Sequence, residues 1–244
     1  MTKFQVCGCF FLGQLLLVGN SPILAQTTIF NAPSTDVLPE KLFYVEADFT
    51  AHLDKFSKGG FQTFGYKTVY GVRKNLEVGA NFFYTRLGGG TAPKEFQANV
   101  KWRAYNNEKY SVAATTGAIV FVPLNKSAGT RTSAMLYTNA SKIIKGAKGM
   151  RLTGGIYTMV GTKREFGTKT GAIVSFEQPV RRRLSFIADW YSGKNRFGYT
   201  AAGLSYAVTK KQFLYTGYNF GNAGRANNSL SIFYGYTLKF ISLS

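Results

Sequence analysis

One histidine and one nearby aspartate are the residues best suited to acid–base chemistry in this 244-residue sequence. Hydrolysis through a nucleophile needs that nucleophile, a base and a group that orients the base. His52 is the only histidine, and Asp48 precedes it by four residues in a stretch that alternates as a strand does. Four residues along a strand span about 13 Å, which is too far for a direct orienting contact. Since no serine nucleophile motif accompanies them, these residues do not predict an enzyme, and no catalytic residue is expected.

The positions of the cysteines argue against thiol and metal chemistry. Both of them, Cys7 and Cys9, lie in an apolar N-terminal stretch that follows Lys3 and precedes the helix-breaking Pro22. These are the features of an export signal. We therefore expect residues 1–25 to be a cleaved signal peptide, which would leave the mature chain without disulfides or thiolate ligands. No metal site and no cofactor are predicted.

Eight charged residues are better candidates for a functional role, because they recur on the polar side of alternating segments. They are Lys67, Lys101, Arg103, Arg151, Glu46, Asp48, Glu77 and Asp189. Basic side chains that line a pore lower the entry barrier for anions. Carboxylates beside them can instead form ion pairs, which cost less than lone charges in a narrow space. Two interpretations stay open: an anion-attracting lining, or structural pairing that leaves the interior plugged.

The formal net charge of +19 makes a nucleic-acid partner a hypothesis to be tested. Much of the surplus lies in short connections such as 72–75, 180–183 and 208–211, and not on one helix or sheet face. This distribution argues against nucleic-acid binding. Basic turns suit contact with anionic lipid headgroups, and they can also draw anions toward the mouth of a pore.

The elements that carry these residues are expected to be strands, because apolar and polar residues alternate with period two. In 95–105, for example, Phe96 and Val100 share one face and Gln97 and Lys101 share the other. No later stretch has 18 consecutive apolar residues, so helical membrane spans are not expected. The twelve predicted strands are 42–53, 61–72, 75–86, 95–105, 109–122, 132–143, 150–162, 168–178, 183–193, 197–208, 211–221 and 229–240.

The connections alternate between tight polar turns and longer glycine-rich loops. This pattern predicts an all-β fold, a transmembrane antiparallel up-and-down β-barrel of twelve strands. The small and charged residues on the polar faces, and aromatic residues near the strand ends, favour a water-filled lumen over the apolar interior of a soluble barrel. We expect residues 42–240 to form the barrel, 26–41 an N-terminal periplasmic segment and 241–244 a short C-terminal extension.

The last predicted strand contains Gly235, Leu238 and Phe240 in the spacing Gly-x-x-apolar-x-aromatic. This spacing resembles the terminal strand of Gram-negative outer-membrane β-barrels, which the barrel-assembly machinery reads as a signal. Phe233 and the four residues after Phe240 depart from that pattern. The resemblance extends over the mature chain. It implies export through the periplasm, residence in the bacterial outer membrane, and contacts with outer-membrane lipids and the assembly machinery.

For such a barrel we expect a narrow channel that lets small solutes pass passively, with a weak preference for anions. Twelve strands are intermediate between small barrels filled by side chains and large open porins. A structural barrel without an open pore is one alternative. An outer-membrane lipid-modifying enzyme is a second alternative, because some barrels of this size resemble phospholipases. The short predicted loops argue against an adhesive surface.

Overall fold

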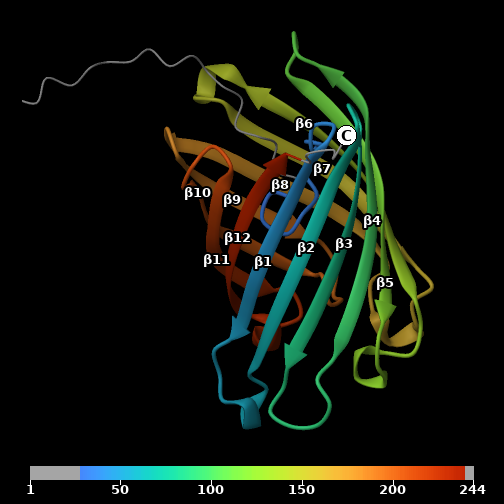
Figure 1. The fold of residues 1–244 in the computed structure, drawn as a ribbon. Coiled ribbons are helices and arrows are strands. Elements are labelled where there is room, and N and C mark those ends of the chain that lie inside the picture. The colour runs from blue at the N-terminus through green and yellow to red at the C-terminus, as the bar shows by residue number, and fades with distance from the viewer. Residues whose placement is uncertain (1–27, 240–244) are drawn as a thin grey trace, which may run out of the picture.

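A computed structural model describes residues 28–239, and within this range twelve strands form one closed antiparallel barrel (Figure 1). Neighbouring strands follow chain order around the barrel, and the last strand pairs with the first to close it. The strands are β1 (Leu42–His52), β2 (Phe61–Arg73), β3 (Leu76–Arg86), β4 (Lys94–Asn107), β5 (Val112–Pro123), β6 (Ser133–Ile144), β7 (Met150–Val160), β8 (Thr170–Arg181), β9 (Leu184–Tyr191), β10 (Tyr199–Ala207), β11 (Gln212–Gly221) and β12 (Ser229–Lys239).

The predicted fold class and strand order are confirmed, and each predicted strand boundary lies within three residues of the observed one. Alternation identifies these strands because each one separates two environments along its whole length. The predicted signal peptide 1–25, Phe240 and the extension 241–244 lie outside the described residues.

The outer surface of the barrel is apolar. Val100, Ile156, Val174 and Ile232 are exposed on the outside, although each stands in the middle part of its strand. A closed barrel with an apolar outer band is the arrangement that a β-protein needs in a lipid bilayer, where no backbone group can be left unpaired. No helix within residues 28–239 is long and apolar enough to cross a membrane.

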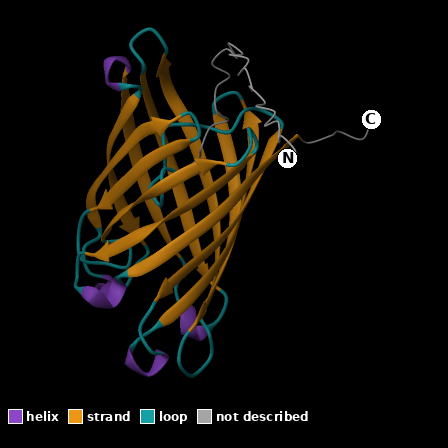
Figure 2. Ribbon diagram, turned by 90° about the vertical axis from the view of Figure 1, so that its left-hand side faces the viewer, coloured by secondary structure: helices purple, strands orange, loops and turns teal. Residues whose placement is uncertain are grey.

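The two ends of the barrel differ (Figure 2). At one end, here called the turn end, the strands are joined mostly by tight turns, and β1 begins and β12 ends there. At the other end, here called the loop end, the connections are longer. Most of the loop-end connections contain a short 3-10 helix: η1 (Phe56–Lys58), η2 (Lys126–Ala128), η4 (Arg164–Phe166) and η5 (Arg225–Asn227); η3 (Lys145–Ala147) lies at the turn end.

The N-terminal segment, residues 28–38, packs against the inner wall of the barrel. The sequence predicted a periplasmic segment over 26–41, but residues 28–38 lie inside the barrel (Figure 1). Ile29 and Phe30 pack against Phe213 and Phe233 of the barrel wall. Leu38 packs against the wall near the start of β1. Burial of these apolar side chains against the inward faces of the strands stabilises the segment inside the lumen.

The segment is compact at its start. Its residues Thr28 and Pro33 form an isolated antiparallel bridge, and the backbone nitrogen of Ile29 donates to the oxygen of Ala32. The chain then runs along the lumen and leaves it at the turn end, where the backbone nitrogen of Lys41 donates to the oxygen of Gly71. The segment therefore occupies part of the lumen as an internal plug that is covalently continuous with β1.

Candidate functional site in the barrel lumen

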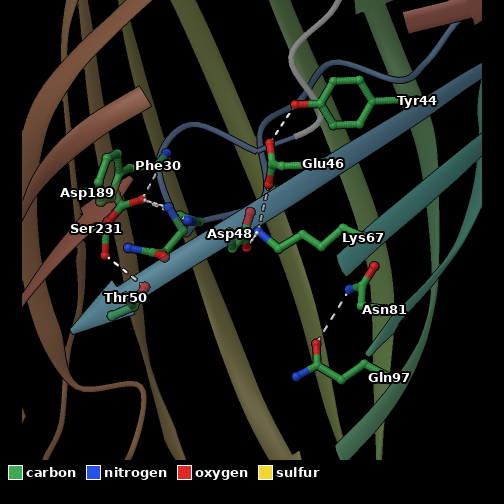
Figure 3. A network of polar contacts seen from close by, with 12 residues as sticks. Phe30, Tyr44, Glu46, Asp48, Thr50, Lys67, Asn81, Gln97, Asp189 and Ser231 are labelled. Atoms are coloured by element: carbon green, nitrogen blue, oxygen red, sulfur yellow. Dashed lines mark hydrogen bonds and ion pairs between the residues drawn. The ribbon is translucent and has the colours of Figure 1, made fainter. Parts of the chain in front are cut away.

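Six of the eight charged residues predicted to line a pore form ion pairs inside the barrel. Lys67 Nζ on β2 lies 2.8 Å from Glu46 Oε1 and 2.6 Å from Asp48 Oδ2 on β1 (Figure 3). Lys101 Nζ on β4 lies 2.9 Å from Glu77 Oε1 on β3. The strand register explains these pairs, since Glu46 is directly opposite Lys67, and Glu77 is directly opposite Lys101.

Arg151 on β7 joins the wall to the N-terminal segment. Its Nη2 lies 2.5 Å from Glu177 Oε2 on β8, and its Nη1 lies 2.6 Å from Asp36 Oδ2 in the segment. Arg103 is different, because it stands at the turn end, where its Nη2 donates to the backbone oxygen of Lys74 and to Asn75 Oδ1. Among the four basic candidates, therefore, three stand inside the barrel and one stands at its end.

The interior is not a basic ring. Between the two ends of the barrel, the described residues place three basic side chains, Lys67, Lys101 and Arg151, in the lumen. Six carboxyl groups stand with them, those of Asp36, Glu46, Asp48, Glu77, Glu177 and Asp189. Since each of the three cations is already paired, their positive charge is largely balanced before any solute arrives.

Asp189 on β9 holds the N-terminal segment instead of a cation. Its Oδ2 accepts hydrogen bonds from the backbone nitrogens of Phe30, Asn31 and Ala32, at 3.2, 2.6 and 2.7 Å. Successive backbone N–H groups that converge on one carboxylate form a concave anion site. A buried carboxylate can thus be satisfied without a basic partner.

Other wall residues hold the rest of the segment. Glu77 Oε2 on β3 accepts from the backbone nitrogen of Leu38 at 2.7 Å. Asn139 on β6 donates to the backbone oxygen of Pro33 at 2.7 Å, and the hydroxyls of Thr35 and Ser141 lie 2.5 Å apart. Several strands far apart in the sequence therefore fix one segment, and each does so with a polar side chain of the lumen face.

A connection at the loop end folds inward over the mouth. Arg196, between β9 and β10, lies with its Nη1 2.7 Å from Glu95 Oε2 at the start of β4, on the other side of the barrel. Its guanidinium also lies 4.6 Å from the ring centres of Phe121 and Phe197. Asn195 anchors the connection by donating to Tyr157 Oη at 2.9 Å. These contacts hold the connection across the mouth of the barrel and narrow its opening at the loop end.

A cavity of about 550 Å³ remains beside the N-terminal segment. Its lining extends from Glu77 and Lys101, on the turn-end side, to Glu95 and Arg196 at the narrowed mouth. Asn31 of the N-terminal segment forms part of the opposite side. The unfilled space therefore runs along the wall formed by β1 to β5 and is bounded by the plug on the other side.

The residues weighed for catalysis are separated by their contacts. His52 stacks on Phe61, with ring centres 5.9 Å apart, and its Nδ1 donates to the backbone oxygen of Asn228. Asp48 bonds Lys67 and not His52. These contacts orient the imidazole by a backbone oxygen in a loop-end connection, and not by a carboxylate.

Gly235 of the predicted assembly signal has a structural role of its own. A Cβ built on Gly235 would lie 2.0 Å from Tyr44 Oη and 2.5 Å from Tyr44 Cζ. The ring of Tyr44 on β1 thus covers Gly235 on β12, while Tyr44 Oη donates to Glu46 Oε2. Leu238 is exposed on the outer face. Phe240 lies outside the described residues, and the signal itself stays a prediction.

Several lumen residues were not found by sequence reasoning. Asp36, in the N-terminal segment, and the pair Arg196 and Glu95 are separated from their partners by about a hundred residues of chain. Phe233, which departs from the terminal-strand pattern, packs on Phe30 with ring centres 5.1 Å apart. The alternation placed Phe233 on the lumen side, but nothing in it identified the segment that covers the ring.

No protein-family model and no curated protein matches this chain. Solved structures do match it. The KdgM porin has a TM-score of 0.56 and 6% identity, covering 79% of this chain and 98% of its own. A structure titled as this porin in complex with disordered oligogalacturonate has a TM-score of 0.53 and 8% identity, covering 82% of this chain and 99% of its own.

An outer membrane phospholipase A from Escherichia coli is less similar in structure, with a TM-score of 0.46 and 15% identity, covering 84% of this chain and 94% of its own. At such low identities the likeness extends to the fold alone. The chain has the fold of a Gram-negative outer-membrane β-barrel: a closed antiparallel barrel whose strands follow chain order and whose outer band is apolar.

Proposed function

We propose that this protein is a channel of the bacterial outer membrane through which small polar solutes pass passively, and that its own N-terminal segment narrows the channel. The cavity along β1 to β5 carries this proposal, because it extends through much of the barrel and reaches the mouth beside Arg196. The fold likeness to a porin supports a channel at this coarse level. No enzymatic activity is part of the proposal.

The side chains of the lumen give little support to the proposed weak preference for anions. Lys67, Lys101 and Arg151 are all paired, so residues 28–239 place no free basic ring in the lumen. Basic residues do gather at the turn end, in 181–183 and at Lys210 and Lys211. We place any anion preference there, where unpaired positive charge raises the local concentration of anions before they enter.

The partners belong to the same proposal. The apolar outer band suits outer-membrane lipids, and the basic turn end suits anionic headgroups. Export through the periplasm with removal of residues 1–25, and recognition of Gly235, Leu238 and Phe240 by the barrel-assembly machinery, complete the expected route to the outer membrane.

Reconstitution into planar bilayers tests the channel. The refolded protein should show small, stable conductance steps, and the reversal potential in a salt gradient should report a weak anion preference. A cation preference would remove the anion part and leave the channel. A variant without residues 28–38 should show larger steps, since the plug no longer occupies the lumen.

A structural barrel without an open pore is the second candidate, favoured by the plug and by the inward loop at Arg196. The same two proteins separate the candidates. Absence of conductance from both the intact barrel and the variant without residues 28–38, each shown to be folded, would contradict the channel. Conductance from the shortened variant alone would identify a barrel that its N-terminal segment keeps closed.

A further inference from the structure

Two neighbouring rows of side chains form the middle of the cavity wall. Strand register places Glu46, Lys67, Asn81 and Gln97 side by side across β1, β2, β3 and β4 (Figure 3). This set is called the polar row. The row one step nearer the loop end contains Asp48, Gly65 and Phe83. Apart from Gly65, the members of both rows line the cavity.

Two buried oxygen atoms in these rows have no hydrogen-bond partner among the described residues. They are Asn81 Oδ1 and Asp48 Oδ1. Asn81 is 9% exposed and Asp48 is 8% exposed. Asn81 Nδ2 lies 3.5 Å from Gln97 Oε1, which is at the outer limit of a hydrogen bond. Because a buried polar group without a partner costs free energy, these atoms point to a ligand with hydrogen-bond donors.

An aromatic surface lies beside the two unpartnered oxygens. The ring of Phe83 lies against Gly65, where a Cβ would come within 2.6 Å of it, so the glycine lets the ring lie close to the wall beside Asp48. Tyr199 and Phe233 also line the cavity. Apolar and aromatic walls with a few polar groups between them are typical of sites for small molecules.

The charges of the wall select against an anionic ligand. Lys67 is shared by Glu46 and Asp48, so this part of the cavity carries more carboxyl than basic groups. A ligand carboxylate here would meet like charge without a free cation to pair with. An amide such as that of Asn81 can both donate and accept, which matches a hydroxyl group, since that also does both.

We propose that the cavity beside the polar row binds an uncharged, polyhydroxylated solute, a neutral sugar in chemical class. Its hydroxyls would donate to Asn81 Oδ1 and Asp48 Oδ1, and the apolar face of its ring would lie on Phe83. This inference rests on the proposed channel, for which it names the solute class.

A matched pair of ligands tests the inference: glucose and glucuronate, which share a ring and differ in charge. Binding to the refolded, detergent-solubilised barrel is measured by calorimetric titration. Glucose should bind, and glucuronate should bind at least about tenfold more weakly. Asn81→Leu, which removes both hydrogen-bonding atoms, should weaken glucose binding about tenfold.

Thr153→Val is the matched control, because Thr153 is a buried lumen residue of β7 that does not line the cavity. It should bind glucose as the unchanged protein does. If Asn81→Leu fails to fold, as judged by gel mobility before and after heating, Phe83→Ala, which removes the ring on which the sugar would lie, takes its place with the same expected loss.

Absence of glucose binding, equal or tighter binding of glucuronate, or an unchanged affinity in the folded variant would each overturn the inference. Conductance is measured on the same preparations. A conducting barrel that does not bind glucose would refute the sugar site and leave the channel. A barrel that binds glucose but never conducts, even without residues 28–38, would refute the channel and leave the site.

Discussion

Asp189 Oδ2, on β9, lies 2.6 Å from the backbone nitrogen of Asn31 in the N-terminal segment. The flanking nitrogens of Phe30 and Ala32 donate to the same oxygen. Hydrogen bonds to an ionised group are about twice as strong as those between neutral groups. One carboxylate of the barrel wall thus fixes the tip of a plug that belongs to the same chain.

Asp189→Ala should release the tip of the segment. Loss of three hydrogen bonds to a charged acceptor should lower the free energy of local opening by more than about 3 kcal/mol, because each such bond contributes about 1.5–3 kcal/mol. Hydrogen exchange at the amides of Phe30, Asn31 and Ala32 measures this directly, and conductance should rise. Asp54→Ala, which removes a carboxylate from an exposed connection, should change neither. Unaltered exchange in Asp189→Ala would mean that apolar packing alone holds the tip.

Lys67→Met should destabilise the barrel itself. The substitution would leave Glu46 and Asp48 buried side by side without a cation, and breaking a buried ion pair costs about 3–5 kcal/mol. Urea unfolding from lipid vesicles gives the free energy. Lys55→Met, at an exposed position, is the control and should cost little. A loss below about 1 kcal/mol for Lys67→Met would show that water or protonation already compensates these carboxylates.

The barrel could be predicted from the sequence because its determinants are local. Along each strand, outward apolar side chains alternate with inward polar ones, as Ala47 between Glu46 and Asp48 shows. Ion pairs such as Lys101 with Glu77 follow once register is known, since the partners stand on adjacent strands. The sequence could therefore predict on which face of each strand the charged residues lie.

The plug could not be predicted in the same way. The N-terminal segment has no alternation, and its residues Asn31, Pro33, Ser34 and Thr35 are those of a loop. Its location depends on contacts with strands more than a hundred residues away, including that of Asp36 with Arg151. Side-chain types alone therefore suggested a segment outside the barrel. The burial of Ile29, Phe30 and Leu38 could not be predicted without knowing the lumen into which they pack.

Arg196→Gln should widen the loop-end mouth. Arg196 is partly exposed, so its ion pair with Glu95 contributes at most about 1 kcal/mol and the barrel should stay folded. The loss of a side chain that crosses the mouth should nevertheless raise single-channel conductance. Arg225→Gln, in the connection between β11 and β12, is a matched control at the same end and should leave conductance unchanged. Equal conductance in both variants would place the narrowest point at the plug.

Gly235→Ala should destabilise the closing seam between β1 and β12. The new methyl group would collide with the ring of Tyr44, which cannot move away without breaking its hydrogen bond to Glu46. We expect a loss of about 1–3 kcal/mol, as for overpacking in other tight interiors. Tyr44→Phe removes the hydroxyl oxygen that the methyl group would meet first and frees the ring from Glu46, so Gly235→Ala should cost less in that background.

The double substitution Tyr44→Ala with Gly235→Ala distinguishes packing from signalling. If the glycine serves only to accommodate the ring, adding Gly235→Ala to Tyr44→Ala should cost nothing further in refolding without cellular machinery. A defect that appears only during assembly in cells, with normal refolding in vitro, would favour the assembly signal over the packing role.

Ile156→Lys tests the orientation of the outer face toward lipid. Ile156 stands in the middle of β7 and is 66% exposed on the outside of the barrel. A lysine near the bilayer midplane of a β-barrel costs about 2–4 kcal/mol, and the cost falls toward zero near the interfaces. Leu53→Lys, at a residue that is 74% exposed just beyond β1 at the loop end, should therefore cost far less. The free energies of folding into lipid vesicles measure both. Equal costs at the two positions would mean that the middle of β7 does not face hydrocarbon.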